Sequence, residues 1–309
     1  MSDQDLGLTL RHLRLVAAIA ATGQISAAAQ QIGISQPAAS RLLAEVELAI
    51  GHPVHLRQGR GMVLTTQGQA LARRAGRVLI ELGDAARELA AIGAGTGGHV
   101  RIGAITGAAL DRVLPALRQA RLALPDITAE VEVGPSDLLA DLILHGRLDF
   151  ALCRLPASHN PVDFSFESLG DEQVNLVVRR DHALLALPQL TPQDLMHYDW
   201  VLPPIGAILR QAVLGRLADL GLPAPPGRLT TSSFLLTLAM LSQSNAIAPL
   251  AQSVAQHFGS DPGAPYAILP LDLGIRMAAY GIVTRAGATL TPASQRIKGL
   301  IEQPGITAA

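Results

Sequence analysis

Apolar residues recur every three or four positions through the first fifty residues, a spacing typical of amphipathic helices. The spacing predicts helices over residues 10–21, 26–31 and 36–50. The first helix would bury Leu13, Val16, Ala17 and Ala20. The third would bury Ala39, Leu43, Val46 and Ile50. These three short helices are expected to share one small core.

Polar residues occupy a second face at the start of the third helix. Ser35 is a favourable N-cap, and Pro37 falls in the first turn, where its missing N–H costs nothing. Gln36, Ser40 and Arg41 lie one turn apart and stay free to touch another molecule. Two helices joined by a glycine turn, with exposed Gln and Arg at the start of the second, are typical of a helix-turn-helix.

Residues 52–65 predict a two-stranded wing that turns at 58–61. Arg57 and Arg60 flank this turn, where each could reach the phosphates or the minor groove of nucleic acid. A solvated loop charge is the alternative for each arginine. Positive charge is concentrated in this part of the chain, because residues 11–77 hold eight arginines against two glutamates, a net of +6, in a chain of net charge -1. A basic end on a near-neutral protein favours nucleic acid as a partner.

A heptad pattern follows over residues 66–92, with apolar positions spaced alternately by four and three. The seven positions are Leu71, Ala75, Val78, Leu82, Ala85, Leu89 and Ile92. We interpret them as the seam of a homodimer. A helix that lies on its own domain is the alternative. The glycine-rich residues 93–98 then predict a hinge.

Buried strands alternate with helices from residue 100 to 302, which predicts an α/β domain with largely parallel sheets. The runs near 160–173 and 268–276 read as crossovers between two lobes. Ligands of such sheets bind beyond the carboxyl ends of the strands. The chain is thus expected to be a multidomain α+β protein, with a winged helix-turn-helix at 8–65, a linker helix at 66–92, the hinge, and a two-lobed domain at 99–303.

Composition removes several other classes of protein. No apolar run approaches the roughly 18 residues of a membrane span. Cys153 is the single cysteine, which excludes an internal disulfide, and the acidic N-terminus does not resemble a secretory signal. We therefore expect a cytoplasmic protein. Neither a nucleophile motif nor a cluster at metal-ligand spacing is present, so we expect no enzyme, metal or cofactor.

The N-terminal motif resembles the LysR-type transcriptional regulators. The sequence SQPAAS at 35–40 is followed at the family's spacing by a set of matching residues. These are Glu47, Gly51, Pro53, Arg57, Arg60, Gly61, Leu64, Thr65 and Gly68. Two positions depart from the pattern, because the family usually has an aromatic residue where Val16 and His55 stand.

The resemblance continues through RIGA at 101–104, GRLDFAL at 146–152, VVRRDHAL at 177–184 and NAIAPL at 245–250. It implies a two-lobed effector domain similar to periplasmic binding proteins, together with a dimer of dimers on promoter DNA. The segments CRLP and WVLPPIGAILR resemble the branch that regulates protocatechuate breakdown and a galactose-binding protein. A small carboxylate effector is expected, aromatic or otherwise, with a sugar as the alternative.

Candidate functional residues follow from the motifs and from the ends of the predicted strands. DNA contacts are expected at Gln36, Pro37, Ser40, Arg41, Arg57 and Arg60, with Gln suited to adenine and Arg to guanine. Effector contacts are expected at Thr106, Gly107, Ser136, Arg154, Pro203, Pro204, Arg210, Ser232, Ser233 and Phe234. Arg154 could clamp a carboxylate or form a structural pair with an acid such as Asp149, and both readings stay open.

Two other classes of function are weighed against this one. A transport-type solute-binding protein would share the two-lobed architecture, but the basic helix-turn-helix and the absence of an export signal oppose it. An enzyme on a two-lobed α/β fold would need a nucleophile and a base, and none stands out. A DNA-binding regulator controlled by a small organic molecule is the favoured hypothesis.

Overall fold

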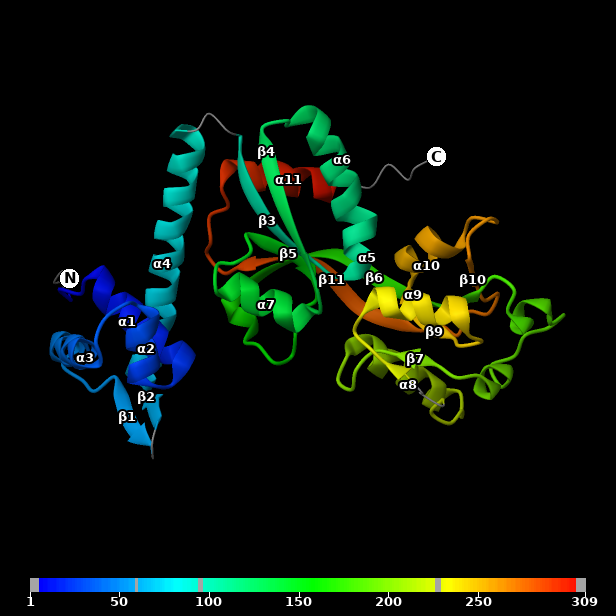
Figure 1. Cartoon of the computed structure of the whole chain (residues 1–309), viewed down its shortest axis with the longest axis horizontal. Coiled ribbons are helices and arrows are strands. Elements are labelled where there is room, and N and C mark those ends of the chain that lie inside the picture. Colours follow the sequence, from blue (N-terminus) through cyan, green and yellow to red (C-terminus); the bar gives the residue numbers. More distant parts are fainter. Residues whose placement is uncertain (1–5, 59–60, 94–96, 226–228, 304–309) are drawn as a thin grey trace. The chain divides into compact units, whose positions relative to one another are not determined.

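The computed structural model describes residues 6–58, 61–93, 97–225 and 229–303. The chain divides into two compact units, residues 1–95 and 96–309. The first unit contains α1 (Leu10–Thr22), α2 (Ile25–Gln31), α3 (Gln36–Ile50), β1 (His55–Gln58), β2 (Gly61–Leu64) and α4 (Thr66–Gly93) (Figure 1). The expected order of three helices, wing and long helix is confirmed. None of the described helices combines the length and apolar character needed to cross a membrane.

The core of the first unit joins α1, α2 and α3 with the residue that precedes the wing. Its buried members are Leu15, Val16, Ala18, Ile19, Ala28, Ala29, Ala39, Leu43, Val46 and Val54. The buried face of α3 agrees with the prediction. The predicted face of α1 was wrong in part, since Ala20 is exposed while Leu15 and Ile19 are buried. His12 Nδ1 accepts from the Thr9 amide (3.0 Å) and its Nε2 bonds Glu45 (3.0 Å), which ties α1 to α3.

The wing and α4 meet at a tight junction that accounts for several motif residues. Val54 donates its N–H to Glu47 Oε1 (2.9 Å), which also bonds His55 Nδ1 (2.9 Å). Thr65 donates its N–H to Val54 O, and its hydroxyl caps α4 by accepting from Gly68 N. A Cβ on Gly68 would lie 1.9 Å from Val54 O, so only glycine fits here.

The linker helix α4 behaves differently in its two halves. Near its start, Leu71 packs against the core of the first unit and Ala75 is fully buried. These two positions of the predicted seam therefore pack within their own unit, in agreement with the alternative of a helix that lies on its own domain. Further along, Val78, Leu82 and Leu89 are 43%, 46% and 70% exposed, and Ala85 is exposed as well. The side chain of Ile92 lies outside the described part.

The second unit is a mixed α/β structure. In chain order its elements are β3 (Gly98–Ala104), α5 (Thr106–Ala108), η1 (Ala109–Val113), α6 (Leu114–Ala123), β4 (Ile127–Val133), α7 (Ser136–Leu144), β5 (Phe150–Cys153), η2 (Pro161–Asp163), β6 (Phe164–Arg179), η3 (Ala183–Ala186), η4 (Asp194–His197), β7 (Val201–Leu202), α8 (Ile208–Asp219), β8 (Leu229–Thr230), α9 (Phe234–Gln243), β9 (Ala248–Ala251), α10 (Gln252–Gly259), β10 (Tyr266–Ile268), β11 (Arg276–Arg285) and α11 (Pro292–Glu302). The segments α5, η1 and α6 follow one another without a break.

The sheet order β10–β6–β11–β5–β3–β4, with β9 also on β6, spans two lobes. In the first lobe β4, β3 and β5 are parallel, whereas β11 runs antiparallel to both β5 and β6. The expectation of largely parallel sheets is thus corrected to a mixed sheet. Two strands, β6 and β11, pass together from one lobe to the other (Figure 1). The crossovers predicted near 160–173 and 268–276 correspond to these strands, but the second begins later, at Arg276.

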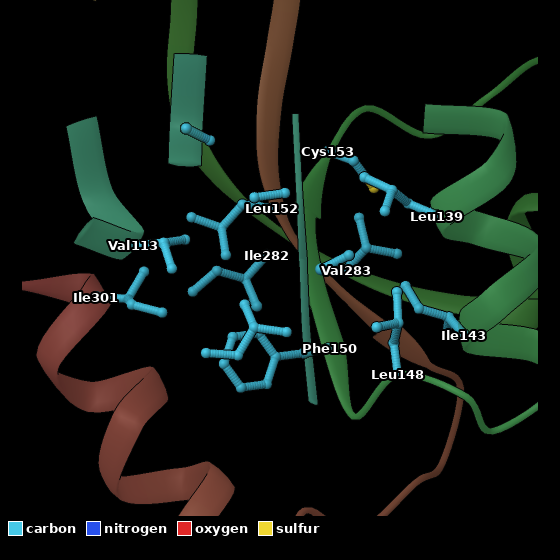
Figure 2. Close-up of a cluster of buried hydrophobic side chains, with 14 of the residues drawn as sticks. Val113, Leu139, Ile143, Leu148, Phe150, Leu152, Cys153, Ile282, Val283 and Ile301 are labelled. Carbon is cyan, nitrogen blue, oxygen red and sulfur yellow. The ribbon is translucent and has the colours of Figure 1, made fainter. Parts of the chain in front are cut away.

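Each lobe has its own apolar core. Figure 2 shows the first-lobe cluster on both faces of the sheet, with Phe150 and Leu152 on the face that also holds Ile282. Cys153 and Val283 point to the opposite face, toward α7. This division follows from the alternation of side chains along a strand. In the second lobe, alternate strand residues likewise serve two buried clusters on either side of the strands.

Candidate functional sites

The start of α3 presents a polar surface. Ser35 is the N-cap, and its side chain accepts from Ala38 N (3.4 Å). The side chains of Gln36, Pro37, Ser40 and Arg41 are all exposed. The core packing of α3 therefore leaves the predicted reading residues accessible together on the first two turns. Arg60 lies outside the described residues, as does the side chain of Arg57.

The first-lobe candidates for effector binding lie where three neighbouring parallel strands end. Thr106 and Gly107 follow β3, Ser136 follows β4, and Arg154 follows β5. Ser136 Oγ accepts from Arg154 N (3.2 Å), which joins two of these ends directly. The strand order thus brings together residues that are up to 48 positions apart in the sequence.

Arg154 is buried and already engaged by protein groups. Its Nη2 donates to Glu172 Oε2 (2.6 Å) and its Nε to Ala278 O (2.8 Å). Both side chains of the pair are 8% exposed, so the charges are largely removed from water and compensate each other. The acid named in the structural alternative, Asp149, instead pairs with Arg101 (2.7 Å). Arg154 therefore links the end of β5 to both crossover strands.

Glu172 contacts the candidate site, and sequence reasoning did not identify it. It lies on β6, opposite Met277 of β11, and is 7% exposed. A Cβ on Gly107 would stand 2.2 Å from Glu172 Oε1 and 3.0 Å from Ser253 Oγ. The sequence signal was an acid close before the apolar run QVNLVV, but Asp171 beside it offered an equal choice.

The second-lobe candidates also gather at the carboxyl ends of parallel strands. Pro203 and Pro204 follow β7, while Ser232 and Ser233 follow its parallel neighbour β8. Thr231 N donates to Leu202 O (3.1 Å), so the two loops leave the sheet side by side. Next to β7 stands β9, through a parallel bridge between Trp200 and Ile247. The end of β9 reaches Gly107 of the first lobe, because a Cβ there would contact Ala251.

The individual second-lobe side chains differ in how they are used. Ser233 caps α9, its hydroxyl accepting from Leu236 N (3.2 Å), and Phe234 packs on Phe258 with ring centroids 5.3 Å apart. Arg210 is half-buried and donates to Pro203 O (3.0 Å). No carboxylate among the described residues pairs with Arg210, and no hydrogen bond there joins it to the first-lobe candidates. Of the two candidate cations Arg154 and Arg210, only Arg154 has an acidic partner among the side chains that the structure describes.

Within the described ranges, Cys153 is not activated as a thiolate and no cluster of metal ligands is found. Burial raises the pKa of the Cys153 thiol to about 12, outweighing the opposing effect of Arg154. A thiol with such a pKa is not the thiolate that redox chemistry requires. No group of three or more His, Cys, Asp or Glu side chains in this part of the chain could hold a metal ion.

Two family models match the chain. Residues 93–303 match the model described as LysR substrate binding domain. Residues 10–69 match the model described as bacterial regulatory helix-turn-helix protein, lysR family. Together the two matches span both compact units.

Curated relatives include three transcriptional regulators. The HTH-type transcriptional regulator GbpR of Rhizobium radiobacter is 43% identical over 249 residues, which cover 80% of this chain and 82% of the relative. GbpR of Azospirillum brasilense is 32% identical, covering 93% and 84%. PcaQ of Agrobacterium fabrum is 31% identical, covering 91% and 90%.

Solved structures share the fold over the whole length. Full-length OxyR C199D from Pseudomonas aeruginosa aligns with a TM-score of 0.62 at 22% identity, covering 96% of this chain and 95% of that one. Full-length CbnR in complex with its target DNA aligns with a TM-score of 0.58 at 21% identity, covering 96% and 100%. At these identities the two alignments show a shared fold.

Proposed function

The chain belongs to the LysR family of transcriptional regulators, DNA-binding and non-enzymatic proteins with an effector-binding domain, and from that premise we propose how it reads DNA and which effector class it binds. Gln36, Pro37, Ser40 and Arg41 enter the major groove of a promoter, where Gln suits adenine and Arg suits guanine. Arg57 and Arg60 hold the backbone from the wing. A regulator of this kind works beside bacterial DNA, in the cytoplasm.

The exposed start of α3 supports the DNA half of the proposal. Replacing Arg41 by Ala should lower affinity for a cognate site by roughly 10- to 100-fold, since a bidentate Arg–guanine contact contributes about 1–3 kcal/mol. The measurement is fluorescence anisotropy on a duplex that the wild type selects from random sequences. Arg118→Ala, an exposed arginine of the other unit, is the control. Equal affinities for wild type and Arg41→Ala would disprove this reading surface.

We propose that the effector is a small carboxylate and that Arg210 receives its charge. Arg154 is compensated by Glu172 and acts as a positioning residue, whereas Arg210 has no acidic partner among the described side chains. A guanidinium at the end of β7 beside the start of α8 suits a carboxylate. Pro203, Ser232 and Thr106 would line the ends of the strands around it.

The effector proposal is tested by melting temperatures with aromatic acids, dicarboxylates and neutral sugars. A ligand present at one hundred times its dissociation constant adds about 2.7 kcal/mol to the unfolding free energy. An acid should stabilise the wild type and the control Arg121→Met, but not Arg210→Met. A neutral sugar that stabilises all three equally would establish the sugar alternative instead.

We also propose a homodimer that pairs through the exposed stripe of α4, and a tetramer as the family resemblance implies. Val78, Leu82 and Leu89 support this pairing, because an apolar stripe at heptad spacing without cover in its own unit is typical of a helix interface. Two reading heads would then require a two-fold site with half-sites about one helical turn apart, or a multiple of that.

A further inference from the structure

Glu172 occupies a position that its pairing with Arg154 explains only in part. Oε2 accepts the hydrogen bond from Arg154 (2.6 Å), while Oε1 is directed at Gly107, where α5 begins. No donor in the described residues bonds Oε1. An unpaired oxygen is either fully buried or in contact with solvent. Oε1 is not among the fully buried unpaired atoms of the described residues, so it keeps some contact with solvent. The residue as a whole is nevertheless 7% exposed.

The surroundings of Oε1 belong to both lobes. A Cβ on Gly107 would lie 2.2 Å from Oε1, 3.0 Å from Ser253 Oγ and 3.4 Å from Ala251 Cβ. Gly107 belongs to the first lobe. Ala251 ends β9 and Ser253 lies at the start of α10, both in the second lobe. An open acceptor therefore lies where the carboxyl ends of the strands of both lobes meet.

We propose that Glu172 Oε1 accepts a hydrogen bond from a hydroxyl group of the effector, which makes the effector a hydroxylated carboxylic acid. The inference rests on the carboxylate effector proposed above and adds a second recognition group to it. A hydroxyl donating to an ionised carboxylate forms a strong, charge-assisted bond. A second cation is disfavoured there, because Arg154 already balances the charge of Glu172 and another buried charge would lack compensation.

The position of Glu172 also connects this contact to the crossover strands. Glu172 pairs in register with Met277 of β11, and Arg154 donates to Ala278 O one residue further along. A hydroxyl bound at Oε1 thus acts on the segment where both strands pass between the lobes. Binding there would bias the arrangement of the two lobes through differential contacts.

The test uses matched acids with and without hydroxyl groups on the full-length chain. The probe pairs are benzoate with 3,4-dihydroxybenzoate, and hexanoate with gluconate, measured by titration calorimetry. In the wild type at least one hydroxylated member should bind about tenfold or more tightly than its partner, since a site built around a hydroxyl strongly rejects the analogue that lacks it. The double variant Arg154→Met with Glu172→Met removes the pair without leaving a buried charge, and the ratio should fall below about threefold.

Two further variants keep the test independent of folding. Glu172→Asp keeps a negative partner for Arg154 but withdraws the carboxylate from Gly107, so it should also lose the ratio. Glu167→Gln is the matched control, because Glu167 lies on the same strand and bonds Lys298 (2.7 Å) away from the site. The control should keep the ratio of the wild type.

The outcomes separate this inference from the proposal on which it rests. Hydroxylated acids that bind no better than their partners, or no binding by any probe, overturn the role of Glu172. The role is also overturned if the preference for the hydroxylated acid persists both in Glu172→Asp and in the double variant Arg154→Met with Glu172→Met. Acids without hydroxyls that bind through Arg210 would leave the carboxylate proposal intact. A neutral sugar that depends on Glu172 but not on Arg210 would overturn the carboxylate and keep the hydroxyl contact.

Discussion

The helices α3 and α4 lie in the same unit and expose opposite kinds of surface. On α3 the apolar residues Ala39, Leu43 and Val46 are all buried, and the start of the helix exposes polar groups. On α4, by contrast, apolar side chains are exposed, among them Leu82 and Leu89. Leu48, which is 85% exposed on α3, is a single apolar residue of the kind common on protein surfaces.

This difference separates two kinds of exposed surface. The apolar residues of the α3 core face are buried within their own unit, which leaves the polar face free for the DNA contacts proposed above. On α4, the predicted seam residues that pack within their own unit are Leu71 and Ala75, both near the start of the helix. Exposure of the rest of the stripe to water is unfavourable in free energy until another apolar surface covers it. One helix is therefore complete before it binds, and the other is not.

The largest expected effect comes from charging the exposed stripe of α4. Burying one leucine stabilises an interface by about 1.5–3 kcal/mol. Leu82→Lys with Leu89→Lys removes four leucines from a symmetric dimer and should weaken association by several powers of ten. Sedimentation velocity should show monomers, while circular dichroism shows the helices retained. Leu122→Lys, at another highly exposed leucine, should leave dimers, and dimers in the double variant would disprove the seam.

Two glycines of α4 sharpen the comparison between its buried start and its exposed remainder. Gly68→Ala would place a Cβ 1.9 Å from Val54 O, so it should lower the unfolding free energy of the first unit by about 3 kcal/mol. Gly76→Ala meets no atom within 4 Å and should raise it by about 0.5–1 kcal/mol through helix propensity. Urea unfolding of the two variants measures both. Equal effects would contradict the tight junction between the wing and α4.

The sequence predicted α3 better than α1, and the reason lies in their composition. Polar residues interrupt the apolar ones in α3, which fixes the phase of the buried face. In α1 the run from Leu15 to Ala20 is apolar at every position, so several faces fit the pattern equally. Only packing against α2, α3 and α4 selects Leu15 and Ile19 for the core and leaves Ala20 exposed.

The candidate effector site was predictable in its loops and not in its contacts. The ends of β3, β4 and β5 can be read from the sequence. Because these strands are parallel neighbours, Thr106, Ser136 and Arg154 lie at the same edge of the sheet, as expected. Strand direction cannot be read from alternation, so the antiparallel β11 and the mixed sheet were missed. The partner of Arg154 depends on how β6 passes beside β11, which separates β6 from β5 in the sheet. That register places Glu172, and not Asp149, against the guanidinium.

The smallest expected effect distinguishes a residue that completes α3 from one that α3 offers to DNA. Ser35 caps the helix at 3.4 Å from Ala38 N, a long hydrogen bond, so Ser35→Ala should lower the unfolding free energy by about 0.5–1 kcal/mol. Ser40 is exposed on the same helix, and Ser40→Ala should leave stability unchanged while it weakens binding to the selected duplex. Urea unfolding without DNA and anisotropy with DNA separate the two effects. If Ser40→Ala destabilises the free protein as much as Ser35→Ala does, the exposed face of α3 also serves its own fold, and the contrast with α4 loses its basis.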